Sequence, residues 1–260
     1  IRDRLYVDDV ALPGNALHVE VGVSEHASAR LKSVDLTKVR TSEGVVDVIT
    51  STDIPGENEV GAVLPGDRLL SSKQVEYVAQ PIFAVAALSL RHAPLAVAKA
   101  VVEYEITEPR LDVDSAMAAK SFVTPSRRWG DGNIASVIKE SDHQVADELY
   151  IRGQEHFYLE PQASFASPRD DGMFIATSSQ HPGEVQSAVA KILGWPMHRV
   201  TVECRRMGGG FGGKESQAAP LACLAAICAD RNGKTVKYRM PRSSDTVSYT
   251  HLTLPTSNGV

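Results

Sequence analysis

A glycine-rich segment near residue 210 carries the pattern with the clearest chemical meaning. It reads Arg206-Met207-Gly208-Gly209-Gly210-Phe211-Gly212-Gly213-Lys214-Glu215 and lies between a predicted strand and a predicted helix. Glycines let a backbone approach a ligand closely, and the unpaired N–H groups at a helix start attract anions. The segment therefore predicts a loop that binds an anionic ligand.

Two nucleotide-binding motifs fit this loop only in part. Gly208, Gly210 and Gly213 satisfy the pattern GxGxxG, but no convincing acidic residue ends a second strand about 20 residues later. Gly208, Gly213 and Lys214 also satisfy most of a phosphate-binding P-loop, yet Glu215 stands where Ser or Thr should bind magnesium. A non-enzymatic nucleotide-binding module that uses Gly208 to Lys214 is therefore one alternative.

A second interpretation takes in more of the chain. The segments GQEHFYLEP (Gly153–Pro161) and TSSQ (Thr177–Gln180) precede the loop, and DIPGEN (Asp53–Asn58) and YVAQP (Tyr77–Pro81) lie further upstream. Together with the glycine loop, these segments resemble the molybdenum hydroxylases, specifically the molybdopterin-binding large subunit of xanthine dehydrogenases. The resemblance covers residues 2–245. Asp53–Asn58 and Tyr77–Pro81 resemble the hammerhead-like α/β domain with which that subunit begins.

The resemblance implies a role for four residues. Gln180 would hydrogen-bond an oxygen on molybdenum, since a neutral amide donates without adding charge to the metal. Phe211 and Gly212 would lie beside the metal and its substrate pocket, and no side chain would ligate molybdenum directly. Glu215 would bind the heterocycle, because purine-oxidising members carry Glu there and aldehyde-oxidising relatives tend to carry an apolar residue.

Each role has a structural alternative. Gln180 could only satisfy backbone groups at a strand end, and Phe211 could be a packed ring in a tight turn. Glu215 could be a favourable charge at a helix N-terminus. Lys214 is left outside the site, as either an anchor of the loop or a solvated charge. His156 and Glu160 are spaced like helical metal ligands, but without a third ligand such a pair indicates packing or surface.

The activity implied by the resemblance is molybdenum-dependent hydroxylation of hypoxanthine and xanthine to urate, with water as the oxygen source. Electrons would pass through two [2Fe-2S] clusters and FAD to NAD. These cofactors would belong to a partner subunit or domain in a hetero-oligomer, since Cys204, Cys223 and Cys228 form no cluster motif. The general-base glutamate is expected beyond this chain, so the fragment alone should be inactive. Oxidation of aldehydes or N-heterocycles with the same cofactor is the nearest alternative.

Composition narrows the class of protein. The 260 residues include 27 Lys and Arg against 32 Asp and Glu, a net charge of −5, which argues against a general nucleic-acid binder. The longest apolar run, Ala218–Ala229, is shorter than the roughly 20 residues that span a bilayer. No secretory signal is visible at the start of the sequence, so a cytoplasmic location is the default expectation.

The elements around these residues predict an α+β fold with mixed sheets and packed helices. Apolar alternation predicts strands, and apolar spacing of three to four predicts helices. The predicted strands are Leu17–Val23, Gly44–Thr50, Gln80–Ala87, Val101–Ile106, Met173–Ser178, Arg199–Arg205 and Thr235–Met240, and the predicted helices are Ser89–Val101, Gly183–Leu193 and Ser216–Ala229.

This pattern divides the chain into four parts. Residues 1–108 form the hammerhead-like α/β domain, and the linker 109–132 contains Pro, Gly and polar clusters. Residues 133–245 begin the molybdopterin-binding domain. Residues 246–260 match nothing expected in the family and resemble translated sequencing adapter, so we expect a non-native tail.

Overall fold

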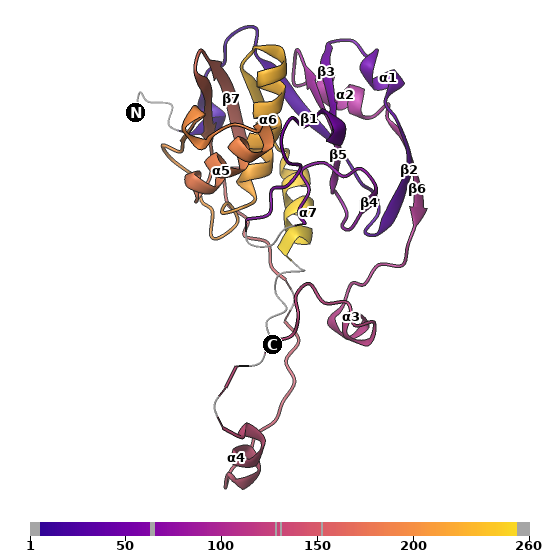
Figure 1. Cartoon of the computed structure of the whole chain (residues 1–260), viewed down its shortest axis with the longest axis vertical. Coiled ribbons are helices and arrows are strands. Elements are labelled where there is room, and N and C mark those ends of the chain that lie inside the picture. The colour runs from indigo at the N-terminus through magenta and orange to yellow at the C-terminus, as the bar shows by residue number, and fades with distance from the viewer. Residues whose placement is uncertain (1–5, 63–65, 128, 131, 152, 254–260) are drawn as a thin grey trace.

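A seven-stranded mixed sheet forms the centre of the molecule and contains strands from both ends of the sequence (Figure 1). The structure is a computed structural model that describes residues 6–62, 66–127, 129–130, 132–151 and 153–253. The strand order is β3-β5-β1-β10-β7-β8-β9. These strands are β1 (Leu17–Val23), β3 (Val45–Thr50), β5 (Pro81–Ala87), β7 (Ala163–Arg169), β8 (Gly172–Thr177), β9 (Val200–Glu203) and β10 (Val236–Arg239).

Strand β1 joins the two parts of this sheet. It pairs antiparallel with β5 on one side and parallel with β10 on the other, where Leu17 lies opposite Val236. Every residue of β1 at alternate positions from Leu17 to Val21 is buried, as its apolar and polar alternation predicts. Residues 1–108 and 133–245 therefore share one sheet, and the predicted domain boundaries remain predictions.

A smaller sheet lies beside the first part of the chain. It has the order β4-β2-β6, with β2 (Ala29–Asp35) between β4 (Gln74–Val75) and β6 (Val101–Ile106). The short helices α1 (Thr37–Arg40) and α2 (His92–Val97) pack against strands of the central sheet, α1 on β3 and α2 on β1 and β5. A cluster of buried apolar side chains, Ala29, Val39, Val75 and Phe83 among them, connects this sheet with the larger one.

Two helices from the second part of the chain pack against the central sheet and against each other. Helix α6 (Ala218–Asn232) is buried along nearly its whole length, and Gly233 ends it in the left-handed conformation that glycine favours. Helix α5 (Pro182–Leu193) begins at His181, whose Nδ1 accepts the Glu184 N–H at 3.1 Å. The sequence predicted both helices.

Some elements differ from the predictions. The helix predicted over Ser89–Val101 spans only His92–Val97, because the chain turns there and enters β6 at Val101. Strands β2 and β7 were not predicted, since β2 is largely polar and β7 contains Pro168 near its end. The predicted linker 109–132 contains the short helix α3 (Val113–Ala118), and α4 (Ile134–Glu140) follows it.

The end of the described chain forms helix α7 (Arg242–Thr253), which continues across the predicted start of the non-native tail at residue 246. Residues 254–260 of that tail lie outside the described residues, so its non-native origin remains a prediction. Of the helices that the structure describes, none combines the length and the apolar character needed to cross a membrane. The α+β class with mixed sheets and packed helices is confirmed.

Candidate functional site

The glycine loop connects β9 to α6, and three of its glycines are required by close contacts. A Cβ on Gly208 would lie 2.5 Å from the Cβ of Glu160, and one on Gly210 would lie 2.5 Å from Oε1 of Gln180. A Cβ on Gly213 would lie 2.8 Å from the ring of Tyr158. The loop is therefore rich in glycine because it is pressed against two neighbouring segments, residues 158–160 and the end of β8.

Gln180 lies three residues beyond β8 and is bonded to the loop by both its backbone and its side chain. Its Oε1 accepts the N–H groups of Gly212 at 2.9 Å and Lys214 at 3.1 Å, and its own N–H donates to the Lys214 carbonyl at 2.7 Å. Two N–H donors at one end of the amide identify that atom as the oxygen. The exposed amide nitrogen of Gln180 has no acceptor among the described residues, so it can donate to a ligand.

Phe211 has an unusual conformation and an unusual exposure for an aromatic residue. Its φ is +53°, in the left-handed region that non-glycine residues seldom adopt, and 72% of its surface is exposed. Such conformations cluster at ligand-binding sites. Gly212 follows with a φ of +92°, which any side chain would strain. The exposure of the ring does not fit a packed aromatic residue, and the role of Phe211 beside a bound metal remains a prediction.

Lys214 is the anchor of the loop rather than a solvated charge. Its side chain is fully buried, and its Nζ donates to the Glu160 carbonyl at 2.7 Å and to the Ser178 hydroxyl at 2.8 Å. It lies 3.5 Å from Oε2 of Glu160 and 4.5 Å from the ring centre of Tyr158. Burial lowers the pKa of Lys214, while the carboxylates of Glu160 and Asp245 oppose that shift.

This burial bears on the nucleotide-binding alternative. In a P-loop the lysine reaches the phosphates of the ligand. Here the ammonium of Lys214 faces the opposite direction, into the protein, where it is held by Glu160 and Ser178. The geometry therefore argues against a P-loop built from Gly208 to Lys214.

Glu160 holds the beginning of the loop. Its Oε2 accepts the Gly208 N–H at 2.7 Å and the Ser178 hydroxyl at 2.8 Å, and its backbone N–H donates to the Gly208 carbonyl at 3.1 Å. From its spacing with His156, Glu160 was predicted to be a packing or surface residue rather than a metal ligand. The packing is correct, but a structural charge pair with Lys214 was missed, because no spacing in the sequence brings residues 160 and 214 together.

Glu215 follows Lys214 and has an exposed side chain. Its carboxylate makes no ion pair or hydrogen bond with any other described residue. Helix α6 begins only at Ala218, so Glu215 precedes the helix rather than lying in its first turn. The structural alternative of a charge placed to interact with the helix N-terminus is weakened by this separation, since that effect falls off within the first turn.

The donor set of the loop suits an oxygen-rich anionic group. Gln180 presents an amide N–H, and the backbone N–H groups of Gly210 and Phe211 have no acceptor among the described residues. Within the part of the chain that the structure describes, no three His, Cys, Asp or Glu side chains gather to hold a metal ion. The loop therefore fits a cofactor that brings its own metal ligands and needs hydrogen-bond donors from the protein.

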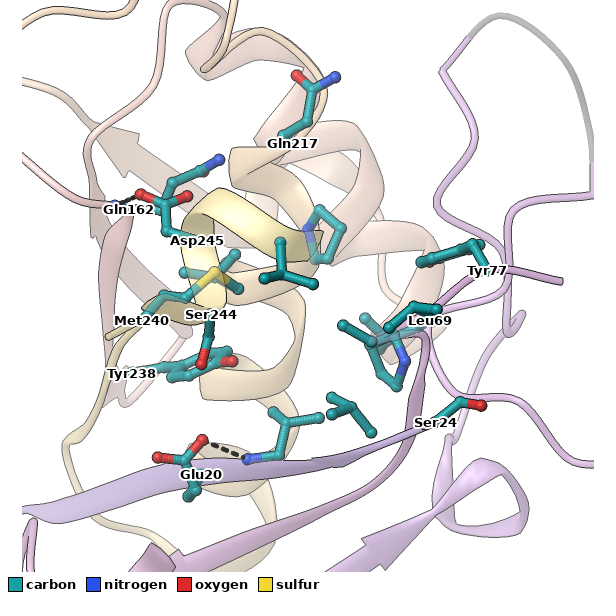
Figure 2. Close-up of a pocket in the computed structure, with 18 of the residues that line it drawn as sticks. Glu20, Ser24, Leu69, Tyr77, Gln162, Gln217, Tyr238, Met240, Ser244 and Asp245 are labelled. Carbon is teal, nitrogen blue, oxygen red and sulfur yellow. Dashed lines mark hydrogen bonds between the residues drawn. The ribbon is translucent and has the colours of Figure 1, made fainter. Parts of the chain in front are cut away.

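A separate cavity of about 440 Å³ lies between β1, the start of α6 and the start of α7 (Figure 2). Glu20 and Asp245 line it, and burial raises the pKa of both carboxyl groups. None of the four predicted site residues lines the cavity. Gln162 is the connection, because it lines the cavity and its Nε2 donates to the Gly213 carbonyl at 3.3 Å.

Comparison with known families accounts for both parts of the chain. Residues 3–108 match the aldehyde oxidase and xanthine dehydrogenase a/b hammerhead domain. Residues 116–253 match the molybdopterin cofactor-binding domain. The predicted hammerhead-like domain followed by the start of a molybdopterin-binding domain is thus confirmed.

Individual relatives agree with these matches. Aldehyde oxidase 4 from Cavia porcellus is 36% identical over 92% of this chain, and xanthine dehydrogenase/oxidase from Felis catus is 33% identical over 94%. The chain spans only 18% of either relative. The solved structure of the aldehyde oxidoreductase from Desulfovibrio gigas is 24% identical, covers 93% of this chain and 29% of its own, and superimposes with a TM-score of 0.82, which supports the fold.

Proposed function

Because the chain belongs to the molybdenum hydroxylase family of aldehyde oxidases and xanthine dehydrogenases, we propose that its glycine loop forms one wall of the molybdopterin site of a purine hydroxylase. One observation carries this proposal. The side-chain oxygen Oε1 of Gln180 accepts the N–H groups of Gly212 and Lys214, so the side-chain amide nitrogen is directed to the exposed side beside the loop. An amide in this position donates a hydrogen bond to an oxygen of the cofactor.

The residues of this chain would bind and orient the cofactor. When bound, the molybdenum cofactor supplies a two-electron redox centre that hydroxylates a substrate with oxygen from water. Gln180 and the N–H groups of Gly210 and Phe211 donate hydrogen bonds, which stabilise negative charge without placing a competing cation at the site. The ring of Phe211, which is exposed in this structure, would exclude water from one side of the bound cofactor. The general base and the electron-transfer groups belong to the rest of the parent enzyme or to a partner subunit.

Glu215 supports a purine as the substrate. Its carboxylate is exposed and makes no contact that would occupy it within the described structure. A carboxylate accepts hydrogen bonds from the ring N–H groups of a purine, which an aldehyde does not have. Oxidation of an aldehyde is the second candidate, and the names of several similar relatives favour it, among them the aldehyde oxidases of Cavia porcellus and Rattus norvegicus.

The first test concerns Gln180. In Gln180→Glu one carboxylate oxygen still accepts the N–H groups of Gly212 and Lys214, but the donor is replaced by a charged acceptor. We expect the parent enzyme to lose roughly 10- to 100-fold in molybdenum affinity, the effect typical of outer ligand-orienting residues. Metal analysis of the purified variant measures this loss. Gln144→Glu, which makes the same change at an exposed position, is the matched control.

Glu215→Val tests the substrate separately. Loss of a hydrogen bond to a charged group should lower kcat/KM for xanthine by roughly 10- to 150-fold in the parent enzyme. The kcat/KM for an aromatic aldehyde should stay the same or rise, and it serves as the internal control. Equal losses on both substrates would show that Glu215 acts on the site as a whole and would contradict purine recognition.

A further inference from the structure

The buried pair of Lys214 and Glu160 connects the two ends of the glycine loop, because Glu160 bonds Gly208 and Lys214 is itself the other end. These contacts suggest a role beyond packing. We propose that this pair is a positioning device: it fixes both ends of the loop and thereby aims the amide of Gln180 at the bound group. The aim toward the cofactor rests on the proposed function above. The claim that the pair holds the loop in one conformation does not depend on the proposed function and can be tested separately.

Lys214 is bonded through its side chain and through both of its backbone polar groups. Its N–H donates to Oε1 of Gln180, its carbonyl accepts the N–H of Gln180 at 2.7 Å and the Ser179 hydroxyl at 3.3 Å, and its ammonium is bound by Glu160 and Ser178. Every polar group of Lys214 therefore connects the loop with residues 160 or 178–180. Lys214 therefore reaches both segments.

The opposite end of the loop, at Gly208, is bonded to Glu160. Glu160 holds Gly208 through two hydrogen bonds, one from its side chain and one from its backbone. Ser178 lies between the two charges: its hydroxyl donates to Oε2 of Glu160 and accepts from Nζ of Lys214. The first and last residues of the loop are thus joined to one buried charge network.

Burial makes this charge network selective for one conformation of the loop. A buried charge that loses its partner is strongly unfavourable, so the network favours one arrangement of the loop over all others. Because Oε1 of Gln180 is held by the N–H groups of Gly212 and Lys214, a loop that shifts would release this oxygen. The amide would then be free to rotate, and its donor would no longer have one direction.

The experiment compares Glu160→Gln, Lys214→Met and the double variant in the 260-residue chain. Hydrogen exchange is measured at the backbone amides of Gly208, Gly212 and Lys214. We expect each single variant to speed exchange at these amides roughly tenfold or more, since a buried group is left unpaired. The double variant leaves no unpaired charge and should exchange more slowly than the sum of the single effects predicts.

Lys237→Met is the matched control. Lys237 on β10 is also a largely buried lysine and pairs with Asp8 at 3.3 Å, and none of its described contacts involves the loop. Its loss should lower overall stability while leaving exchange at Gly208, Gly212 and Lys214 unchanged relative to the rest of the sheet. If Lys214→Met does not fold, the milder Glu160→Gln decides the question.

The outcomes separate this inference from the proposed function. Unchanged exchange at Gly212 and Lys214 in folded Glu160→Gln, or equal acceleration in Lys237→Met, would overturn the positioning role. Accelerated exchange in the chain supports control of the loop even if Gln180→Glu proves to bind molybdenum normally in the parent enzyme, a result that would refute only the proposed function. Loss of molybdenum in both Gln180→Glu and Glu160→Gln would support both the positioning of Gln180 by the charge pair and the binding of the cofactor by Gln180.

Discussion

The glycine loop and the stretch at 109–151 both lack long regular elements, yet they differ in how they are held. The loop makes hydrogen bonds with residues 32 to 54 positions away, at Gln180 and Glu160. Side-chain hydrogen bonds within the described part of 109–151 join residues at most five positions apart. The stretch also exposes large apolar side chains, with Val145 97% exposed and Trp129 84%.

Distant contacts, rather than secondary structure, therefore determine which irregular segments have a defined shape. Local caps such as that of Asp112 on the Ser115 N–H start a short helix but attach it to nothing else. The buried charges of the loop attach it to two other segments. A binding site requires the second kind of contact, because its donors must keep their directions.

Outside the hydrophobic core, the largest effect should follow from crowding the loop. Gly210→Val places a side chain where a Cβ alone would lie 2.5 Å from Oε1 of Gln180. We expect the free energy of unfolding to fall by about 1–3 kcal/mol, the typical cost of overpacking. Urea denaturation measures it. Gly14→Val is the control, since a Cβ on Gly14 meets no atom within 4 Å, and equal losses in the two variants would contradict the close packing of the loop.

An intermediate effect is expected at Asp47, which belongs to another long-range anchor. Asp47 on β3 accepts hydrogen bonds from Arg231 at 2.7 Å and Asn232 at 3.2 Å near the end of α6. Burial alone would raise the pKa of Asp47, but the hydrogen bonds and charge of Arg231 outweigh burial and lower it. Asp47→Asn should reduce the free energy of unfolding by about 1 kcal/mol at neutral pH.

The sign of the pH dependence follows from that shift. Because the pKa of Asp47 is lower in the folded state, its contribution is present above the ordinary aspartate pKa and is lost as the pH falls through the folded value. The stability difference between wild type and Asp47→Asn should therefore shrink below about pH 4. Urea unfolding at pH 7, 5 and 3 tests this, and a constant difference at all three would speak against it.

The smallest effect belongs to the exposed stretch. Val137 of α4 is 65% exposed, so Val137→Lys should change the free energy of unfolding by no more than about 0.5 kcal/mol. Val189 on α5 is fully buried, so the same change from valine to lysine at this position should prevent stable folding. Thermal unfolding of both variants compares them. A large loss in Val137→Lys would mean that α4 packs against the body of the protein after all.

Much of the fold was predictable because apolar periodicity is a local property. The alternation at Leu17–Val23 and the helical spacing that ends at Gly194 define β1 and α5 almost to the residue. Strand β7 was missed, since Ala163–Arg169 is rich in small residues and gains its burial only by pairing with β8 and β10. Helix α2 is shorter than predicted, because Val101, the last predicted residue, pairs with Asp35 in the small sheet as the start of β6.

The sequence alone indicated which residues could act at the site: a loop of glycines with one aromatic ring, an amide at 180 and a carboxylate at 215. How these residues are held in place depends on the tertiary structure. Glu160, Ser178 and Lys214 lie on three different segments, and their bonding depends on how β8, β9 and α6 assemble. Local patterns cannot encode such a network, because its energy comes from burying charges that meet only after the chain has folded.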